Sequence, residues 1–139
     1  LDLRVVLEGR GMERACVDGM TDEEMAELLQ LKGQIETAIR SCDTMELHEH
    51  MDIDARLHSL LNSLNHNQVM TEMWQRIVPV NVVVQRLSLK HDARALQSQE
   101  EHLQIIECLL KKDYAAANEI NRLHLLHTSA HVEKSLSRE

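Results

Sequence analysis

The sequence predicts an all-α protein that folds as one antiparallel helical bundle over residues 1–139. Leu, Met, Ala, Glu and Gln are frequent, whereas the chain has 4 glycines, 1 proline and no phenylalanine, a composition that favours helices over strands. Apolar residues recur at steps of three and four along most of the chain, which is the helical period. At 139 residues the chain is also long enough to bury a substantial core.

The first predicted helix is amphipathic and ends near Gly19. Its apolar face comprises Leu3, Val6, Leu7, Met12, Ala15 and Cys16. Gly9 and Gly11 either weaken this helix or allow another helix to approach it closely. Thr21 begins a capping-box motif, so a second helix starts there and ends around residues 41–43.

The third predicted helix runs from about residue 44 to residue 64, and residues 65–67 then form a turn. A fourth helix covers about residues 68–89. Pro79 lies inside this fourth helix and lacks the amide proton that a helix interior uses, so we expect a kink there.

The last part of the chain is predicted to form a helical hairpin. Residues 91–98 are polar and are expected to form a loop or a frayed helix start. A fifth helix covers about residues 99–110, and Asp113 caps a sixth helix that runs to about Leu136. Six helices joined by short connections are typical of an antiparallel bundle.

The charge pattern argues against direct contact between this chain and nucleic acid. The net charge is −8, and the 15 lysines and arginines are scattered without forming a basic stripe. Trp74 and Tyr114 are the only large aromatic residues, so the sequence offers no platform on which bases could stack.

The cysteines and the hydropathy indicate a cytoplasmic protein. Cys16, Cys42 and Cys108 are odd in number and form no CxxC pair, which is typical of thiols in a reducing compartment. The sequence shows no signal peptide, and no apolar run approaches the roughly 18 residues of a membrane span. Because the chain begins inside a helical pattern without an initiator methionine, we expect that an N-terminal portion is missing.

Asp54 and His58 lie one turn apart on the third predicted helix. They share one stripe with the apolar residues Leu47, Met51 and Leu61. An ionised carboxylate on this buried face costs several kcal/mol of folding free energy unless a positive charge compensates it. A metal ion would stabilise both side chains, whereas a neutral Asp–His pair would satisfy itself by hydrogen bonding. The pair alone leaves both interpretations open.

His102 and His124 are the candidates for further metal ligands. In a hairpin that pivots at Asp113, each histidine is 11 residues from the pivot, so both lie at the same height. Helical proteins build metal sites from side chains that face one another inside the bundle. Asp54, His58, His102 and His124 together offer three imidazoles and one carboxylate. This set suits zinc first, with nickel or manganese as alternatives, and leaves coordination positions for water or a ligand oxygen.

The other histidines of the helices receive weaker assignments. His127 and His131 continue the stripe of His124 along the sixth helix, and we expect them to line the site rather than to bind the metal. His48 and His50 stand among acidic residues and are expected on a solvated face.

Short motifs along most of the chain resemble those of a known family. They are Arg4 with Glu8, Asp54 with His58, Asn67, Glu101 with His102, Asp113, Ala117 and His124. In this order and spacing they resemble the C-terminal ligand-binding (FCD-type) domain of FadR-like, GntR-type transcription regulators. The chain departs from the family at Leu57, where a phenylalanine is usual.

The resemblance implies an antiparallel bundle of six to seven helices that forms a homodimer. In the metal-binding branch of the family, the positions that match Asp54, His58, His102 and His124 hold a divalent metal. A small carboxylate or related organic acid would bind in the central cavity. Its presence would be transmitted to an N-terminal winged-helix domain, which binds DNA and which this chain lacks.

The first hypothesis is therefore an effector-sensing domain of a bacterial transcription regulator, and not an enzyme. Arg4 would complete the site for the carboxylate of the effector, because a guanidinium binds a carboxylate through two hydrogen bonds. Arg4 could equally pair with Glu8, four residues further along the helix. Arg86 is a weaker candidate for the same role.

Two alternatives to an effector-sensing domain remain, a metal-dependent hydrolase and a metal-free dimerisation module. A metal-dependent hydrolase would need a general base beside the metal, and Glu101, next to His102, points to a different side of its helix. A metal-free helical dimerisation module would satisfy Asp54 and the histidines internally.

Overall fold

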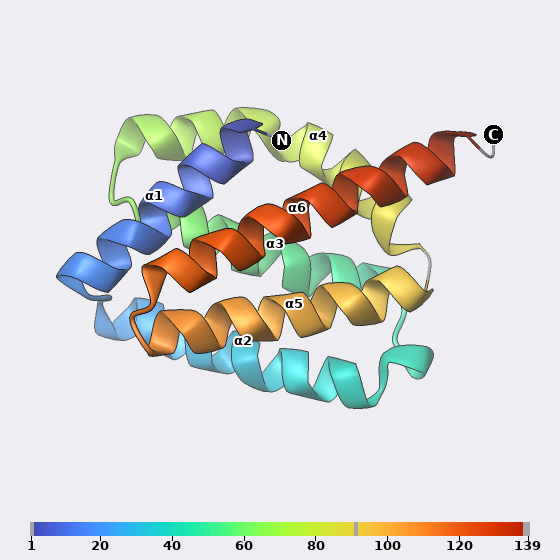
Figure 1. Ribbon diagram of the computed structural model, residues 1–139, viewed down its shortest axis with the longest axis horizontal. Helices are drawn as coiled ribbons and strands as arrows, with labels where there is room; N and C mark the ends of the chain where they lie inside the picture. Colours follow the sequence, from blue (N-terminus) through green and yellow to red (C-terminus); the bar gives the residue numbers. More distant parts are fainter. Residues whose placement is uncertain (1, 91, 138–139) are drawn as a thin grey trace.

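The computed structural model describes residues 2–90 and 92–137, and in these residues the chain is helical with no strand. Its elements are α1 (Asp2–Asp18), α2 (Asp22–Arg40), the short 3-10 helix η1 (Cys42–Thr44), α3 (Leu47–Ser63), α4 (Gln68–Leu89), α5 (Asp92–Leu110) and α6 (Tyr114–Ser137). The predicted all-α helical bundle is therefore confirmed (Figure 1).

Two helices, α1 and α4, pack against both α3 and α6. α3 packs against α1, α2 and α4, and α6 packs against α1, α4 and α5. Figure 1 shows α1 and α6 crossing the front of the bundle, with α4 above them and with α2 and α5 below. Because α1 and α4 contact both α3 and α6, they enclose the space between these two helices.

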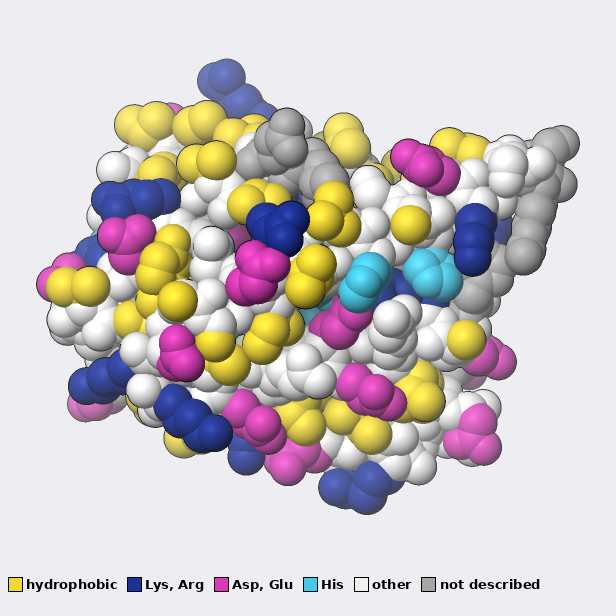
Figure 2. Space-filling model, viewed as in Figure 1, with side chains coloured by type: hydrophobic (Ala, Val, Ile, Leu, Met, Phe, Trp, Pro, Cys, Tyr) yellow, Lys and Arg dark blue, Asp and Glu magenta, His cyan; other side chains and the backbone are white. Residues whose placement is uncertain are grey.

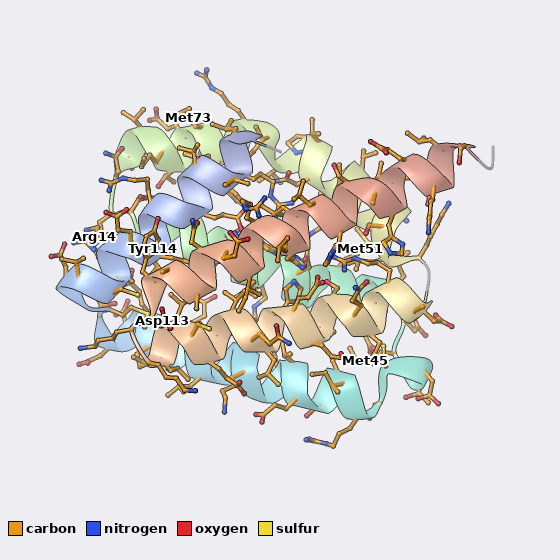
Figure 3. All side chains as sticks on the ribbon, in the orientation of Figure 1. Arg14, Met45, Met51, Met73, Asp113 and Tyr114 are labelled. Carbon is orange, nitrogen blue, oxygen red and sulfur yellow. The ribbon has the colours of Figure 1, made fainter. Side chains whose placement is uncertain are left out.

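Side chains cap three helices where the sequence predicts them to start. Thr21 Oγ1 accepts from the backbone amide of Glu24 at 3.1 Å, and Glu24 Oε1 accepts from the amide of Thr21 at 2.9 Å, which completes the capping box of α2. The side chain of Asn67 accepts from the amide of Met70 at the start of α4. Asp113, in the turn between α5 and α6, caps α6 (Figure 3).

The start of α5 differs from the prediction. The helix begins at Asp92, so residues 92–98 are its first turns rather than a loop, and His91 lies outside the described residues. Arg94 and Ser98, in this polar stretch, are 0 % and 2 % exposed. The stretch shows no apolar stripe because its buried face consists largely of polar side chains, so the hydrophobic period could not reveal the helix.

Two smaller expectations concern the middle of the chain. α3 begins at Leu47, three residues later than predicted, because η1 occupies the preceding residues. α4 continues as one helix through Pro79, and the kink at this residue stays a prediction.

The main apolar core lies between α1, α2, α3 and α5. Its fully buried side chains include Met12, Leu28, Leu31, Ile35, Leu57, Leu61, Ile105 and Ile106. α1 approaches α3 closely at Gly11, where a Cβ atom would lie 1.9 Å from the backbone oxygen of Leu61. Of the two roles that the sequence leaves open for this glycine, close approach is therefore the one found.

Several apolar side chains are exposed on the outer sides of α1 and α4. This α1–α4 apolar face consists of Leu3, Val6, Val69, Met73, Val80 and Val83. Figure 2 shows apolar side chains gathered over the part of the molecule where α4 and α1 lie.

Within residues 2–90 and 92–137, none of the helices has the length and apolar character that crossing a membrane requires.

Candidate metal centre

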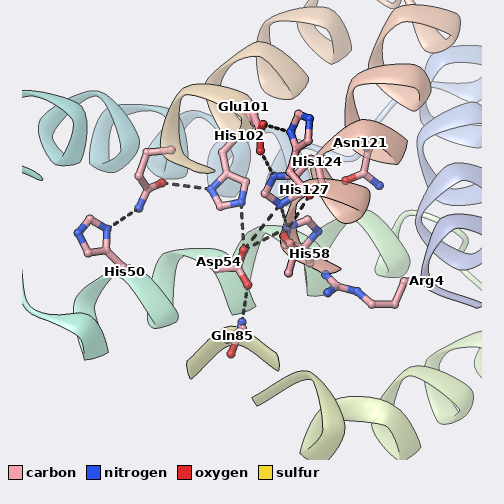
Figure 4. Close-up of polar contacts among 12 residues, drawn as sticks. Arg4, His50, Asp54, His58, Gln85, Glu101, His102, Asn121, His124 and His127 are labelled. Atoms are coloured by element: carbon pink, nitrogen blue, oxygen red, sulfur yellow. Dashed lines mark hydrogen bonds and ion pairs between the residues drawn. The ribbon is translucent and has the colours of Figure 1, made fainter. Parts of the chain in front are cut away.

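Four side chains from three helices converge inside the bundle. Asp54 and His58 come from α3, His102 comes from α5 and His124 from α6, and each is at most 6 % exposed. One ligand atom from each residue lies within 4.8 Å of those of the other three (Figure 4). The fold therefore brings together all four residues that the sequence predicts as metal ligands.

Glu8 on α1 holds the ring of His58. Oε1 of Glu8 accepts a hydrogen bond from Nδ1 of His58, and Oε2 accepts one from Nε of Arg4 at 3.0 Å. Burial favours the neutral form of Glu8, but the charges of His58 and Arg4 outweigh it and lower the pKa of this carboxyl below its usual value. Glu8 is therefore ionised and keeps a proton on Nδ1 of His58.

Gln99 and His50 hold the ring of His102. Nδ1 of His102 lies 3.1 Å from Oε1 of Gln99, and Nε2 of Gln99 lies 3.0 Å from Nδ1 of His50. His50 is 2 % exposed, so its predicted place on a solvated face is wrong, whereas His48 is exposed as predicted. His50 is buried because it lies one turn before Asp54 on the face of α3 that points into the bundle.

Glu101 on α5 holds the ring of His124. Its Oε1 atom lies 2.7 Å from Nδ1 of His124, and its Oε2 atom lies 2.6 Å from Nδ1 of His127. The buried guanidinium of Arg94 also donates to Oε1, at 2.9 Å. Burial favours the neutral acid, but the hydrogen bond from His124 and the nearby positive charges lower the pKa of Glu101 to about 2.

The side of α5 that carries Glu101 faces α6. Glu101 does point away from the ligand side chain of His102, as predicted, but this direction leads it to His124 rather than to solvent. His127 contacts Glu101, which agrees with its expected position beside the site. His131 lies one turn further along α6 and is partly buried.

Asp54 faces all three imidazoles. Its Oδ1 atom lies 3.0 Å from Nε2 of His102, 3.3 Å from Nε2 of His58 and 4.0 Å from Nε2 of His124. Its Oδ2 atom accepts a hydrogen bond from Nε2 of Gln85 on α4 at 2.5 Å. Burial favours the neutral acid, but His58 and His102 outweigh it and lower the pKa of Asp54 well below its usual value.

When the three rings are neutral, none of the four atoms that face one another at the centre carries a proton. Each imidazole directs Nδ1 to an acceptor outside the group, so a neutral ring leaves a lone pair on Nε2. The three Nε2 atoms and Oδ1 of Asp54 then face one another as four acceptors. Within the described residues, Nε2 of His102 has no hydrogen-bond partner, although it lies 3.0 Å from Oδ1 of Asp54. This arrangement stabilises a cation at its centre.

A proton and a metal ion are the two candidates for that cation. Burial works against a charged imidazole, but the carboxylates of Glu8 and Asp54 raise the pKa of His58 to about 9. Burial lowers the pKa of His102, and it lowers the pKa of His124 to about 3. In the absence of a metal, His58 is therefore the ring that carries a proton at the centre.

The FCD domain profile matches residues 1–127 of the chain. The chain belongs to the FCD-domain family. The FCD-type domain that the sequence resembles is thereby confirmed. A solved structure described as the metal-free FCD domain of TM0439, a proposed transcriptional regulator, matches with a TM-score of 0.83 and 25 % sequence identity, over 99 % of this chain and 91 % of that chain. No curated protein matches the sequence.

The two arginines predicted to bind an effector have different surroundings in this FCD domain. Arg4 is 8 % exposed, pairs with Glu8, and lies over the ring of Trp74 with its guanidinium carbon 5.6 Å from the ring centroid. Arg86 is exposed, and the fold does not bring it to the ligand group. The residue before it, Gln85, occupies the side of α4 that faces the centre.

Space beside the centre of this FCD domain is small and divided. A cavity of about 180 Å³ lies between α1, α4 and α6, and its lining includes Leu3, Arg4, Val80, Val84, Leu125 and Thr128. A narrower space reaches the ligand atoms and is lined by Asp54, His124, Arg4, Ser88, Ser98 and Thr128, among others. Arg4, Val84 and Thr128 border both spaces.

Gln85, Gln99 and Arg94 hold ligand side chains but were not anticipated from the sequence. Gln99 carried a usable signal, because it lies three residues before His102 and therefore near the same face of α5. Gln85 contacts Asp54, and Arg94 donates to the backbone oxygen of His124, at sequence distances of 31 and 30 residues. A single sequence contains no signal for contacts of that kind.

Proposed function

We propose that this FCD domain binds a divalent metal ion through Asp54, His58, His102 and His124. The observation that supports this most directly is that one ligand atom from each of these four buried side chains lies within 4.8 Å of those of the other three. An ionised carboxylate and neutral rings with their proton on Nδ1 are the forms that a metal ion requires. At metal sites, each ligand side chain usually makes a further hydrogen bond to a residue that orients it. Here that role belongs to Glu8, Gln99, Glu101 and Gln85.

The donor set also bears on the identity of the metal. Three imidazole nitrogens and one carboxylate oxygen suit zinc, with nickel and manganese as alternatives. A metal that accepts five or six ligands would keep one or two positions for water or for an oxygen of an effector. The related TM0439 domain is described as metal-free, so the same fold also forms without the ion.

We further propose that the effector is a small organic acid bound beside the metal. The narrow space next to Asp54 and His124 is bordered by the buried guanidinium of Arg4 and by Ser88. Among the described residues, Oγ of Ser88 has no hydrogen-bond partner, so it is available to a ligand. One carboxylate oxygen on the metal and a second near Arg4 would use both features. Arg86 is too exposed for this role.

The role in transcription is proposed from the family. TM0439 is described as a proposed transcriptional regulator, and the net charge of −8 disfavours DNA binding by the bundle itself. We propose that effector binding changes the arrangement of a separate winged-helix domain that binds DNA and is joined to α1. Glu8 and Arg4 support this route, since they connect the metal ligand His58 to α1.

The α1–α4 apolar face is proposed as the surface of a homodimer. Val80 and Val83 are 63 % and 57 % exposed, which a monomer leaves in water at a cost in free energy. We expect Val80→Glu to convert a dimer to a monomer in analytical ultracentrifugation. Val17, 77 % exposed at the other end of α1, provides the control Val17→Glu. Equal sedimentation of both variants and the wild type would argue against this surface.

The metal site is tested by metal content. The protein is stripped with a chelator, loaded with Zn²⁺, Ni²⁺ or Mn²⁺, passed through a desalting column and measured by inductively coupled plasma mass spectrometry. We expect bound metal in the wild type and its loss in His58→Ala. His48→Ala, on the exposed side of the same helix, is the matched control and should bind like the wild type. A wild type that retains no metal, or a His58→Ala variant that retains as much, would contradict the site.

One observation favours a metal-free alternative. The pKa of about 9 at His58 means that a proton can occupy the centre, so the domain could act as a metal-free dimerisation module. The same metal measurement separates the two functions. No observation favours a hydrolase, because Glu101, the candidate for a general base considered from the sequence, is already bound by His124, His127 and Arg94.

A further inference from the structure

The ring of His102 is held differently from the other two imidazoles of the centre. His58 and His124 each direct Nδ1 to a carboxylate, from Glu8 and Glu101. A carboxylate can only accept, so it keeps the proton of its histidine on Nδ1. His102 directs Nδ1 to the amide of Gln99 instead. An amide can accept through Oε1 or donate through Nε2, so by itself it would not decide where His102 carries its proton.

His50 decides the orientation of that amide. Nδ1 of His50 lies 3.0 Å from Nε2 of Gln99, and Nε2 of His50 lies 3.7 Å from the sulfur of Cys42. A proton on Nε2 of His50, directed at the sulfur, would leave a lone pair on Nδ1, to which the amide nitrogen of Gln99 would donate. Oε1 of Gln99 would then face His102 and accept from its Nδ1 atom. In this arrangement all three hydrogen bonds run in one direction, from His102 outward to Cys42.

We propose that Gln99 and His50 are positioning residues of the metal centre, which keep the proton of His102 on Nδ1 and leave its Nε2 atom available to the cation. This inference rests on the metal site proposed above. Gln99 and His50 are 1 % and 2 % exposed, so water does not compete for these hydrogen bonds.

The opposite orientation of the Gln99 amide is the state that Gln99 and His50 together would exclude. If Nε2 of Gln99 faced His102, Nδ1 of the histidine would have to accept, and the proton of the ring would move to Nε2. That atom lies 3.0 Å from Oδ1 of Asp54, so the ring would donate a hydrogen bond from Nε2 to Asp54. Nε2 of His102 could then not bind a metal. The orientation of the Gln99 amide therefore determines whether Nε2 of His102 has a lone pair for a metal ion or carries a proton.

The position of the proton can be measured without any metal. Long-range ¹H–¹⁵N correlation spectra of the metal-free domain distinguish the two neutral forms of a histidine. We expect His102 to carry its proton on Nδ1 in the wild type and on Nε2 in Gln99→Leu. In Gln99→Glu a carboxylate faces the ring in place of the amide and should return the proton to Nδ1. A wild-type His102 protonated on Nε2, or a proton that stays on Nδ1 in Gln99→Leu, would overturn the proposal.

Zinc affinity gives the second readout, measured by competition with a chromophoric chelator. Loss of a residue that orients a ligand typically lowers metal affinity by about 10- to 100-fold, and we expect this range for Gln99→Leu and His50→Leu. Gln99→Glu should lose less affinity than Gln99→Leu, because it restores the acceptor for Nδ1 of His102. A residue that only filled space would not be rescued by a buried carboxylate. His48→Ala is the control for His50→Leu.

The two readouts separate the failure of this inference from the failure of the metal site. A wild type that binds no zinc but shows the expected proton positions would refute the metal site and leave the control of His102 standing. Zinc binding by Gln99→Leu that equals the wild type would refute the positioning role. If Gln99→Leu does not fold, as judged by circular dichroism, His50→Leu provides the same comparison with the amide still present.

Discussion

Gly11 fixes the distance between α1 and α3, and its replacement by alanine should destabilise the bundle. The added Cβ atom would lie 1.9 Å from the backbone oxygen of Leu61, whereas Cβ contacts under 3.0 Å are essentially never found. The two backbones would have to separate by about 1 Å, since neither atom belongs to a flexible side chain that could turn away.

The magnitude follows from two opposing effects. Overpacking of a well-packed core costs about 1–3 kcal/mol, and a contact between Cβ and backbone belongs at the upper end of this range. Alanine is favoured over glycine inside a helix by about 1 kcal/mol, which offsets part of the cost. We therefore expect Gly11→Ala to lower the free energy of unfolding by about 2 kcal/mol.

Gly33 provides a matched control on α2. It also lies inside a helix, but no heavy atom lies within 4 Å of its added Cβ, so Gly33→Ala keeps only the helix preference. This variant should gain up to about 1 kcal/mol. In urea titrations the two variants should shift the midpoint in opposite directions while the slope stays that of the wild type. A Gly11→Ala variant as stable as the wild type would refute the close approach of α1 and α3.

The same variant connects the fold to the metal centre. Glu8 lies one turn before Gly11 on α1, and its carboxylate holds the ring of His58. Separation of α1 from α3 would lengthen this hydrogen bond, so Gly11→Ala should also bind zinc more weakly, whereas Gly33→Ala should bind it as the wild type does. Unchanged zinc affinity in a destabilised Gly11→Ala would show that Glu8 does not position His58.

Three further predictions follow from the contacts of the bundle. Glu101 has a folded-state pKa of about 2, below its usual value of 4.5, so its contribution to stability is complete above pH 4.5 and is lost as the pH falls toward 2. Urea midpoints should therefore fall less steeply with acid in Glu101→Gln than in the wild type, and parallel curves would contradict this. Asn67→Ala removes the cap of α4 and should cost about 1 kcal/mol of stability in the same titrations, whereas Asn67→Asp keeps an acceptor and should cost less. Chelation of a zinc-loaded sample should remove about 2.7 kcal/mol of stabilisation if free zinc had been about 100 times its dissociation constant, and scanning fluorimetry should show the lower melting temperature.

The positions of the four residues proposed as metal ligands could be predicted because two simple regularities determine them. Asp54 and His58 share an apolar stripe at a spacing of four, so the helical period places both on the buried face. His102 and His124 are equally distant from the turn at Asp113, and antiparallel helices bring such residues to the same height. Neither regularity requires knowledge of how the remaining helices pack.

Apart from Gln99, the residues that hold the proposed ligands could not be predicted, because their contacts depend on the packing of other helices. Glu8 reaches His58 across 50 residues, and Gln85 reaches Asp54 across 31. The start of α5 was missed for a related reason. Arg94 is fully buried, yet a charged residue in a polar stretch normally indicates a solvated segment. Its burial is permitted by Glu101, Thr128 and the backbone oxygen of His124, which lie on later parts of the chain.

The distribution of these partners indicates how a cation would act on the bundle. α3, α5 and α6 supply the ligand atoms, while α1 and α4 hold two of the ligands through Glu8 and Gln85. A cation at the centre would therefore strengthen contacts between five helices, although it would add nothing to the internal hydrogen bonds of any one helix. The expected consequence is a change in how the helices are held together, which is the kind of change that can reach the winged-helix domain proposed to be joined to α1. Since Arg4 both pairs with Glu8 and borders the space beside the ligand atoms, an acid that competes with Glu8 for this guanidinium would act on the same helix.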